Sequence, residues 1–346
     1  MYGADGVPAL PTRSFFFQFH AVRNKTTLNQ MDIGSIVGGL IALCATMAMP
    51  AQTMKVTLLG TGAPPPVMDR FGPSTLIEAG TEKIVIDVGR GAAQRIWQLG
   101  IPLGGVTAVL LTHLHSDHTV GIPDLWLTGW INNRFGGRKE PFQIYGPAGT
   151  SDLMANLKKA YAWDIRTREA DEKLPPQGIV VAAKDVTAGV VFERNGVKVT
   201  AFETDHGPLI KPTLGYRVDF GGHSVVLTGD TRPSDEIVKA SKGVDVMIHE
   251  VAFAADELLA TSEAMKRVMD HHSSPQGAGR DFARSNPKLA VYSHIALLTD
   301  GKVAAPTMEQ LVIETRKTYK EPLEVGTDLM TITIGATIEV GHPAVK

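Results

Sequence analysis

The chain has 346 residues and a formal net charge of −2, from 34 Lys and Arg against 36 Asp and Glu. Hydrophobic residues make up 43% and charged residues 20%, a composition that excludes an intrinsically disordered chain. The balance of charge also argues against nonspecific nucleic-acid binding through a surplus of cations, although local basic patches stay open.

An uncharged apolar run spans residues 33–49 and contains Cys44, the one cysteine of the chain. Three basic residues precede this run and Pro50-Ala51 follows it, which is the order of a secretory signal peptide. The run is short for a membrane span, which needs about 20 apolar residues. We therefore predict that residues 1–51 are an N-terminal extension with a signal peptide. The mature protein is then periplasmic or secreted, without stable membrane insertion; the alternative is an uncleaved anchor.

Residues 52–346 are predicted to form one hydrolase domain in which β-rich and helical segments alternate. The predicted strands cover residues 55–59, 75–78, 83–87, 107–112, 190–192, 197–202, 214–218, 224–227, 244–248 and 290–292. The predicted helices cover residues 91–98, 151–161, 235–241, 254–269, 275–285 and 307–319. Asn195-Gly196 and Gly221-Gly222 indicate hairpin turns. This order predicts an α/β fold, an αββα sandwich of two packed β-sheets flanked by helices.

Two segments of this domain allow more than one interpretation. The charged, Pro-containing segment 164–186 has little periodicity and is predicted to be a surface loop or cap. Trp126 and Trp130 are four residues apart and share one face of a predicted helix. They either line an entrance that favours aryl groups or pack in the core.

The strongest local signal is a cluster of three histidines and one aspartate directly after the apolar run 108–111. The cluster consists of His113, His115, Asp117 and His118. Imidazole and carboxylate are ligands that suit zinc and neighbouring first-row metals. An exposed histidine-rich turn is the alternative, but the position at the end of a buried strand argues against it.

One cluster offers too few ligands for two metal ions, and three downstream residues complete the set. His206, Asp230 and His294 each follow a predicted strand. Sites in α/β folds usually form at strand ends, so the three side chains are expected to converge on one edge of the sheets. Taken singly, Asp230 is also compatible with a helix cap, and the two histidines with ordinary loop positions. Together with the first cluster they predict a dinuclear metal site.

The segment from His113 to His118 resembles the signature of the metallo-β-lactamase superfamily. Leu58-Leu59-Gly60-Thr61-Gly62 and Asp87-Val88-Gly89 are similar to the opening strand and the Asp-x-Gly motif of that family. Further segments resemble its ribonuclease Z and arylsulfatase branch: Tyr145-Gly146-Pro147, Gly215-Tyr216-Arg217, Thr228-Gly229-Asp230-Thr231 and His249-Glu250. The resemblance extends from about residue 55 to residue 294.

The resemblance implies two zinc ions, with manganese or iron as alternatives, and a hydroxide between them that attacks an ester. It assigns three residues to one metal, three to the other and one to both. The first set is His113, His115 and His206; the second is Asp117, His118 and His294; and Asp230 bridges the two.

The resemblance also implies a group that assists the leaving oxygen. His272-Ser273 fits the segment in which ribonuclease Z carries such a histidine, and Glu250 is placed to orient it. Asp117, His272 and Glu250 are therefore the predicted catalytic residues. For His272 the alternative is a place in the cap region of the helix that begins near Pro275.

One departure from ribonuclease Z bears on the substrate. Only the short segment 219–223 is present where ribonuclease Z usually carries its tRNA-gripping arm. With the predicted export, this favours a small anionic or aryl ester over tRNA, and no tRNA partner is expected. The sequence thus predicts an exported dinuclear hydrolase that cleaves a phosphodiester or an aryl sulfate ester.

Other functions and the oligomeric state stay open. A lactonase, carboxylic esterase or β-lactamase would use the same site. From other classes, an iron-dependent redox enzyme and a noncatalytic metal-binding protein are the alternatives. Members of the branch are often dimers, so a homodimer is open as well.

Overall fold

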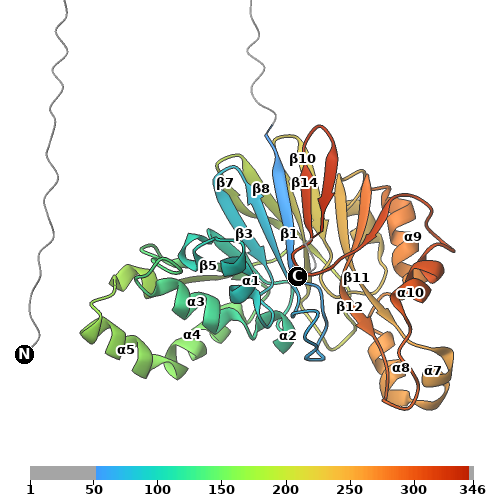
Figure 1. Ribbon diagram of the computed structural model, residues 1–346, viewed down its shortest axis with the longest axis horizontal. Coiled ribbons are helices and arrows are strands. Elements are labelled where there is room, and N and C mark those ends of the chain that lie inside the picture. The colour runs from blue at the N-terminus through green and yellow to red at the C-terminus, as the bar shows by residue number, and fades with distance from the viewer. Residues whose placement is uncertain (1–51, 343–346) are drawn as a thin grey trace, which may run out of the picture. The chain divides into compact units, whose positions relative to one another are not determined.

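Two β-sheets pack face to face with helices on their outer sides, in a computed structural model that describes residues 52–342 (Figure 1). This arrangement confirms the predicted αββα sandwich. The predicted extension and signal peptide, residues 1–51, lie outside the described residues. The domain boundary, export, the homodimer and the periplasmic or secreted location therefore stay predictions. Among the described residues, no helix is long and apolar enough to cross a membrane.

The first sheet has eight strands, and its central strands are buried on both faces, as their runs of Val, Ile and Leu predict. In spatial order the strands are β15 (Ile338–Gly341), β14 (Thr331–Ile334), β1 (Met54–Gly60), β2 (Ser74–Ala79), β3 (Glu82–Ile86), β4 (Ala108–Leu110), β5 (Phe142–Gly146) and β6 (Val181–Asp185). Strands β3 to β6 are parallel.

The second sheet has seven strands. In order they are β13 (Leu323–Val325), β12 (Leu289–Leu297), β11 (Val246–Phe253), β10 (His223–Leu227), β9 (Leu214–Phe220), β8 (Val197–Glu203) and β7 (Gly189–Arg194). The Asn195-Gly196 and Gly221-Gly222 turns close the β7–β8 and β9–β10 hairpins, as predicted, and all four residues have positive φ. Val56 and Ile84 of the first sheet and Val218 and Val225 of the second belong to one buried core between the sheets.

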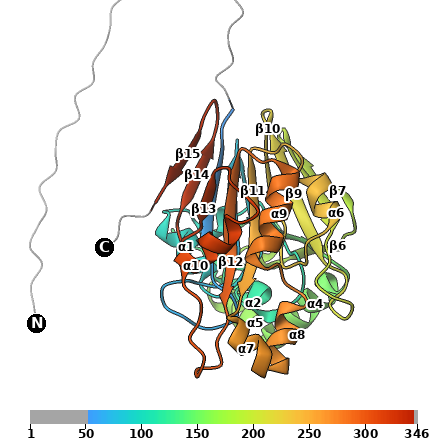
Figure 2. The same cartoon turned by 90° about the vertical axis from the view of Figure 1, so that its right-hand side faces the viewer.

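Helices cover the outer faces of both sheets (Figures 1 and 2). Those that follow strands of the first sheet are α1 (Ala92–Gln98), α2 (Ser116–Thr119), α3 (Ile122–Trp130), α4 (Thr150–Ala160) and α5 (Ala162–Asp171). Those of the second half are α6 (Asp235–Ala240), α7 (Asp256–Thr261), α8 (Glu263–Met269), α9 (Pro275–Ser285) and α10 (Met308–Thr315). Two short 3₁₀ turns, Leu103–Gly105 and Pro176–Ile179, complete the described elements.

The two tryptophans of α3 pack in the core. Trp126 and Trp130 are fully buried, and their indole nitrogens donate to the carbonyl oxygens of Ile179 and Pro175. Burial with a satisfied N–H is what a core tryptophan requires. Of the two interpretations left open by the sequence, the structure therefore selects the core.

Three sequence-based predictions of local structure are wrong. Segment 164–186 is not a loop, because it contains most of α5, a 3₁₀ turn and β6. Only Ile165 of α5 is buried, and β6 is an edge strand, so neither shows a clear period. The helix predicted over 254–269 is two helices, since Ser262 ends α7 and its hydroxyl caps α8 by accepting from the Met265 amide. The strand predicted over 290–292 continues to Leu297 as β12.

The strand directions gather the predicted ligands at one edge of the sandwich. Strand β8 is antiparallel to β9, which is antiparallel to β10, so β8 and β10 run the same way. Strands β10, β11 and β12 are mutually parallel. The carboxyl ends of β8 and β10 therefore lie at the same edge, and the segments that follow them carry His206 and Asp230.

Asp328 ties the segment after β1 to the rest of the domain. Its carboxylate accepts from the backbone amides of Thr61 and Phe71, at 2.9 and 2.8 Å, and pairs with Arg95 at 3.0 Å. The Asp328→Ala variant is expected to lower the free energy of unfolding by about 3 kcal/mol, because it leaves buried donors unpaired. Urea unfolding measures the loss, and an unchanged midpoint would contradict it. Asp328→Asn retains one acceptor and is expected to lose less.

Candidate metal centre

Five chain segments supply the predicted ligands. His113 and His115 follow β4, and the short helix α2 carries Asp117 and His118. The others are His206 after β8, Asp230 after β10 and His294 within β12. The structure brings all seven side chains together, and all but His115 are buried. One group consists of His113, His115, His206 and Asp230, and another of Asp117, His118 and His294; within each group the ligand atoms lie within 4.8 Å of one another.

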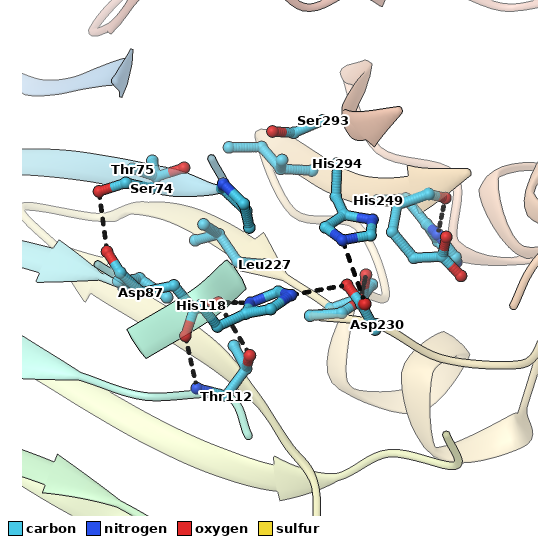
Figure 3. A pocket seen from close by; sticks show the side chains of 16 residues that line it. Ser74, Thr75, Asp87, Thr112, His118, Leu227, Asp230, His249, Ser293 and His294 are labelled. Carbon is cyan, nitrogen blue, oxygen red and sulfur yellow. Dashed lines mark hydrogen bonds and ion pairs between the residues drawn. The ribbon is translucent and has the colours of Figure 1, made fainter. Parts of the chain in front are cut away.

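Asp230 lies between the two groups. Its Oδ2 is 3.9 Å from the Nε2 atoms of both His113 and His206, and 3.2 Å from Nε2 of His294. Its Oδ1 is 3.4 Å from Nε2 of His118, and Figure 3 draws the contacts of Asp230 with His118 and His294. Asp230 thus faces imidazoles of both groups, His113 and His206 of one and His118 and His294 of the other, which is the arrangement of a bridging ligand. This role for Asp230 follows the prediction from sequence and remains to be tested.

The donor atoms fit divalent metal ions. Among the described residues, Nε2 of His113, His118 and His206 and Oδ1 of Asp230 are buried without a hydrogen-bond partner within the protein. Burying one such atom unpaired costs about 1–3 kcal/mol, so several aimed at one point require a common partner. Imidazole nitrogens and carboxylate oxygens suit zinc and other first-row metals.

Contacts at the far side of two rings fix which nitrogen faces the centre. Nδ1 of His118 is 2.8 Å from Asp87 Oδ2, and Nδ1 of His206 is 2.8 Å from the carbonyl oxygen of His271. Each Nδ1–H donates to its oxygen, which leaves Nε2 of each ring facing Asp230. Such outer contacts set the tautomer and orientation of metal-binding histidines.

Asp87 is a functional residue that sequence reasoning did not identify. Its Oδ1 accepts from the Thr112 amide and its Oδ2 from the Thr112 hydroxyl, both at 2.8 Å. Its φ of 57° lies in the left-handed region, where a non-glycine residue is strained. Asp87 thus holds the start of the His113–His118 segment and the His118 ring together. The signal was the Asp-x-Gly motif after β3, which had been assigned to the family resemblance without a role.

The Asp87→Ala variant is expected to bind metal about 10- to 100-fold more weakly, because an outer contact that orients a ligand is lost. Competition with a chelating dye measures the affinity. Asp87→Asn serves as the matched control, since it keeps an acceptor for the Thr112 amide and is expected to lose less. Unchanged affinity in Asp87→Ala would show that His118 does not need this contact.

The electrostatics of the centre keep His113, His206 and Asp230 in metal-binding protonation states. Burial lowers the pKa of His113 well below its usual value and that of His206 to about 4, so both imidazoles stay neutral. Burial alone would raise the pKa of Asp230, but the charges of His294 and His118 outweigh it and hold this pKa well below its usual range. Asp230 is therefore ionised and the two histidines have free lone pairs.

His294 does not end its strand, as the sequence had indicated, but interrupts it. Its φ is 43°, and the β11–β12 register shifts between His249 and Val251 opposite it. This local irregularity turns the His294 ring toward the centre, where Nε2 is 3.2 Å from Oδ2 of Asp117. The strand resumes afterwards, which is why β12 is longer than its apolar run predicts.

His272 and Glu250 form a polar pair at the rim of the centre. Nδ1 of His272 is 3.2 Å from Oε2 of Glu250, and Oε1 of Glu250 accepts from the Ser273 amide at 2.7 Å. Burial lowers the pKa of His272, but the Glu250 carboxylate outweighs it and raises this pKa to about 9. His249, which precedes Glu250, is buried with Nε2 3.5 Å from Asp281, and does not belong to the ligand groups.

A cleft of about 520 Å³ opens at the centre. Its polar end contains His115, Asp117, Asp230, His272 and His294. The remaining wall is mostly apolar and includes Met265 and Val268 of α8, Leu297 at the end of β12 with the following Leu298, and Met308 of α10. A substrate at the centre therefore meets charge at one end of the cleft and aliphatic side chains along the rest.

Comparison with known proteins identifies the family. Residues 78–295 match the model of the β-lactamase superfamily domain. A ribonuclease Z of Mycobacterium bovis is 35% identical over 284 residues, which cover 81% of this chain and 98% of the relative. A metallo-β-lactamase fold protein of Bacillus subtilis has a TM-score of 0.64 at 18% identity, covering 82% of this chain and all of the other.

The human tRNase Z, short form, has a TM-score of 0.58 at 22% identity, covering 80% of this chain and 98% of the other. The prediction of a small-molecule substrate without tRNA is wrong, because the relatives that share a third of their residues with this chain are named ribonuclease Z. An aryl sulfate substrate finds no support in them either. The chain belongs to the metallo-β-lactamase superfamily of metal-dependent hydrolases, in its ribonuclease Z branch.

Proposed function

We propose that this protein is a metal-dependent phosphodiesterase that cleaves RNA, with tRNA precursors as its substrate class. The observation that carries the proposal is the position of Asp230 between two groups of buried imidazoles, with His272 and Glu250 at the rim of the same cleft. The identity to ribonuclease Z over most of the chain supports RNA as the substrate.

The metal proposed for this centre is zinc. The ligand set is rich in imidazole with two carboxylates, which zinc favours, while manganese and iron remain alternatives for some of the same ligands. Bound divalent ions would supply positive charge opposite the phosphate oxygens and lower the pKa of water toward neutrality. Metal analysis of the purified protein tests this, and the expected result is about two zinc ions per chain.

The protein's own groups are proposed to handle the protons. Oδ2 of Asp117 borders the polar end of the cleft and is placed to accept a proton from the attacking water. Because Nδ1 of His272 is held by Glu250, its Nε2 remains to donate a proton to the leaving oxygen. The aliphatic wall beside His272 fits the apolar faces of nucleobases next to the scissile phosphate.

The test compares four substrates on the same zinc-loaded protein: a transcribed tRNA precursor with extra terminal nucleotides, bis-p-nitrophenyl phosphate, p-nitrophenyl sulfate and a lactone. The proposal expects cleavage of the precursor and of the phosphodiester, with neither sulfate nor lactone turnover. Cleavage of the small phosphodiester without cleavage of the precursor would reject RNA as the substrate. Lactone turnover alone would reject phosphodiester chemistry.

A further inference from the structure

Helices α4 and α5 project from the sandwich and present exposed aromatic rings. The pair extends away from the sheets in Figure 1, and Ile165 is the one buried residue of α5. The side chain of Trp163 is 70% exposed and that of Tyr161, at the junction of the two helices, is 37% exposed. An indole that is mostly exposed gains little from the fold and is available for contact with a partner.

Three cations without an ion pair lie close in sequence to the two aromatic residues. Lys158, Lys159 and Arg166 are exposed, and none of them has a carboxylate within 4.0 Å in the described part of the chain. Arg168, by contrast, is neutralised by Asp164 at 3.0 Å and by Glu172 at 2.6 Å. The helix junction therefore carries free positive charge.

Helical spacing places Arg166 and Trp163 on the same side of α5. Trp163 and Arg166 are three residues apart in α5 and share one face. The unpaired acidic residues Glu169 and Asp171 lie toward the other end of the helix. We call the set Lys158, Lys159, Tyr161, Trp163 and Arg166 the junction patch.

The junction patch lies at the same end of the molecule as the metal centre. Helix α2, which carries Asp117 and His118, and helices α4 and α5 occupy the lower half of both views (Figures 1 and 2). No long arm lies between β9 and β10, because these two described strands are joined directly at Gly221-Gly222. Within the described residues, α4 and α5 thus offer a projecting basic and aromatic surface at that end.

We infer that the junction patch binds an RNA strand outside the cleft, with a base stacked on Trp163 and phosphates at Lys158, Lys159 and Arg166. Aromatic rings interleaved with cations are the means by which proteins hold single-stranded nucleic acid without reading its sequence. The chain as a whole has no surplus of positive charge, so attraction for phosphate has to come from a local group of cations such as this patch. This inference rests on the proposed RNA substrate and adds where the substrate is gripped.

Binding and cleavage are measured separately on the zinc-loaded full chain. A fluorescein-labelled single-stranded RNA with phosphorothioate linkages, which resist hydrolysis, reports Kd by anisotropy. Trp163→Ala is expected to weaken binding about tenfold, because base stacking on an aromatic ring is lost. Trp163→Phe is expected to recover most of the affinity, since phenylalanine still stacks. Turnover of bis-p-nitrophenyl phosphate is expected to stay unchanged in both variants.

The charge is tested through the salt dependence of Kd. The double variant Lys158→Ala/Lys159→Ala is expected to reduce the slope of log Kd against log salt by about 1.4, from about 0.7 per lost single-strand phosphate contact. Lys239→Ala is the control, because Lys239 is an exposed lysine of α6 outside the patch. It is expected to leave the slope unchanged.

The outcomes separate this inference from the proposed function. Unchanged Kd and salt slope in the patch variants would overturn the patch, even if the wild-type protein cleaves RNA. An equal loss of RNA binding and of bis-p-nitrophenyl phosphate turnover would show that Trp163 only supports the fold, and would overturn it as well. RNA binding that depends on Trp163, in a protein that fails to cleave RNA, would retain the patch and reject the proposed function.

Discussion

Asp230→Ala is expected to abolish metal binding and to lower kcat/KM for a phosphodiester by about 1,000-fold or more. The carboxylate is the one group whose two oxygens face both sets of imidazoles, so its removal affects both metal positions. A loss of several kcal/mol of charge stabilisation corresponds to at least three powers of ten in rate, at about 1.4 kcal/mol for each. Metal content by mass spectrometry and initial rates are measured on the same preparation.

Two further variants separate this effect from misfolding. Asp230→Asn retains the volume of the side chain and is expected to fold, yet to bind metal poorly because the charge is lost. Asp245→Ala removes another buried carboxylate. Asp245 directly precedes β11, does not belong to the ligand groups, and accepts from the Ser224 amide at 2.8 Å. The variant is expected to cost stability but to keep the metal. Two metal ions per chain in Asp230→Ala would disprove the bridging assignment.

The sequence predicted most strands correctly because they are short apolar runs bounded by turn residues. The Gly221-Gly222 turn is an example, since its two positive φ values require glycine and the flanking runs then pair as a hairpin. Strand β6 and helix α5 were not predicted. An edge strand and a helix with one buried residue have no regular pattern of apolar residues. Periodicity reports burial, so elements that bury little are invisible to it.

The convergence of the seven predicted ligands could be anticipated because strand ends meet at one edge of the sheets. The details depend on backbone conformations that no pattern of residue types encodes. The φ values of 57° at Asp87 and 43° at His294 are examples, because both are set by the surrounding contacts. The orientation of His206 by a backbone carbonyl, that of His271, is equally independent of side-chain type.

The error about the substrate has a different origin. The expectation of a small ester rested on the export predicted from residues 1–51 and on the missing arm between β9 and β10. The short hairpin was predicted correctly. The short hairpin excludes an RNA-binding arm at this connection, but it does not exclude RNA binding at other surfaces. The junction patch on α4 and α5 is such a surface.

His272→Ala is expected to retain both metal ions and to lower kcat for the RNA substrate by about 100- to 10,000-fold, the usual contribution of a general acid. The ring lies at the rim of the cleft, where Nδ1 contacts Glu250, and it is grouped with Asp230 and His294 within 4.8 Å. KM is expected to change little, because the proton is transferred only in the transition state. Unchanged kcat would remove His272 from the mechanism, and loss of metal would make it a ligand instead.

The pH profile distinguishes proton donation from a merely structural role. A general acid must be protonated, so with a pKa of about 9 at His272 the rate is expected to fall as pH rises through that value. Burial opposes the charged ring, and the Glu250 carboxylate overcomes it; Glu250→Gln removes that carboxylate while preserving the shape of the pair. The alkaline limb of the profile is therefore expected to move to lower pH in Glu250→Gln. Some leaving groups, such as p-nitrophenolate, depart as stable anions and need no proton. The rate of cleavage of a substrate with such a leaving group is expected to change less in both variants. Equal losses with both kinds of leaving group would mean that the pair holds the cleft in shape rather than delivering a proton.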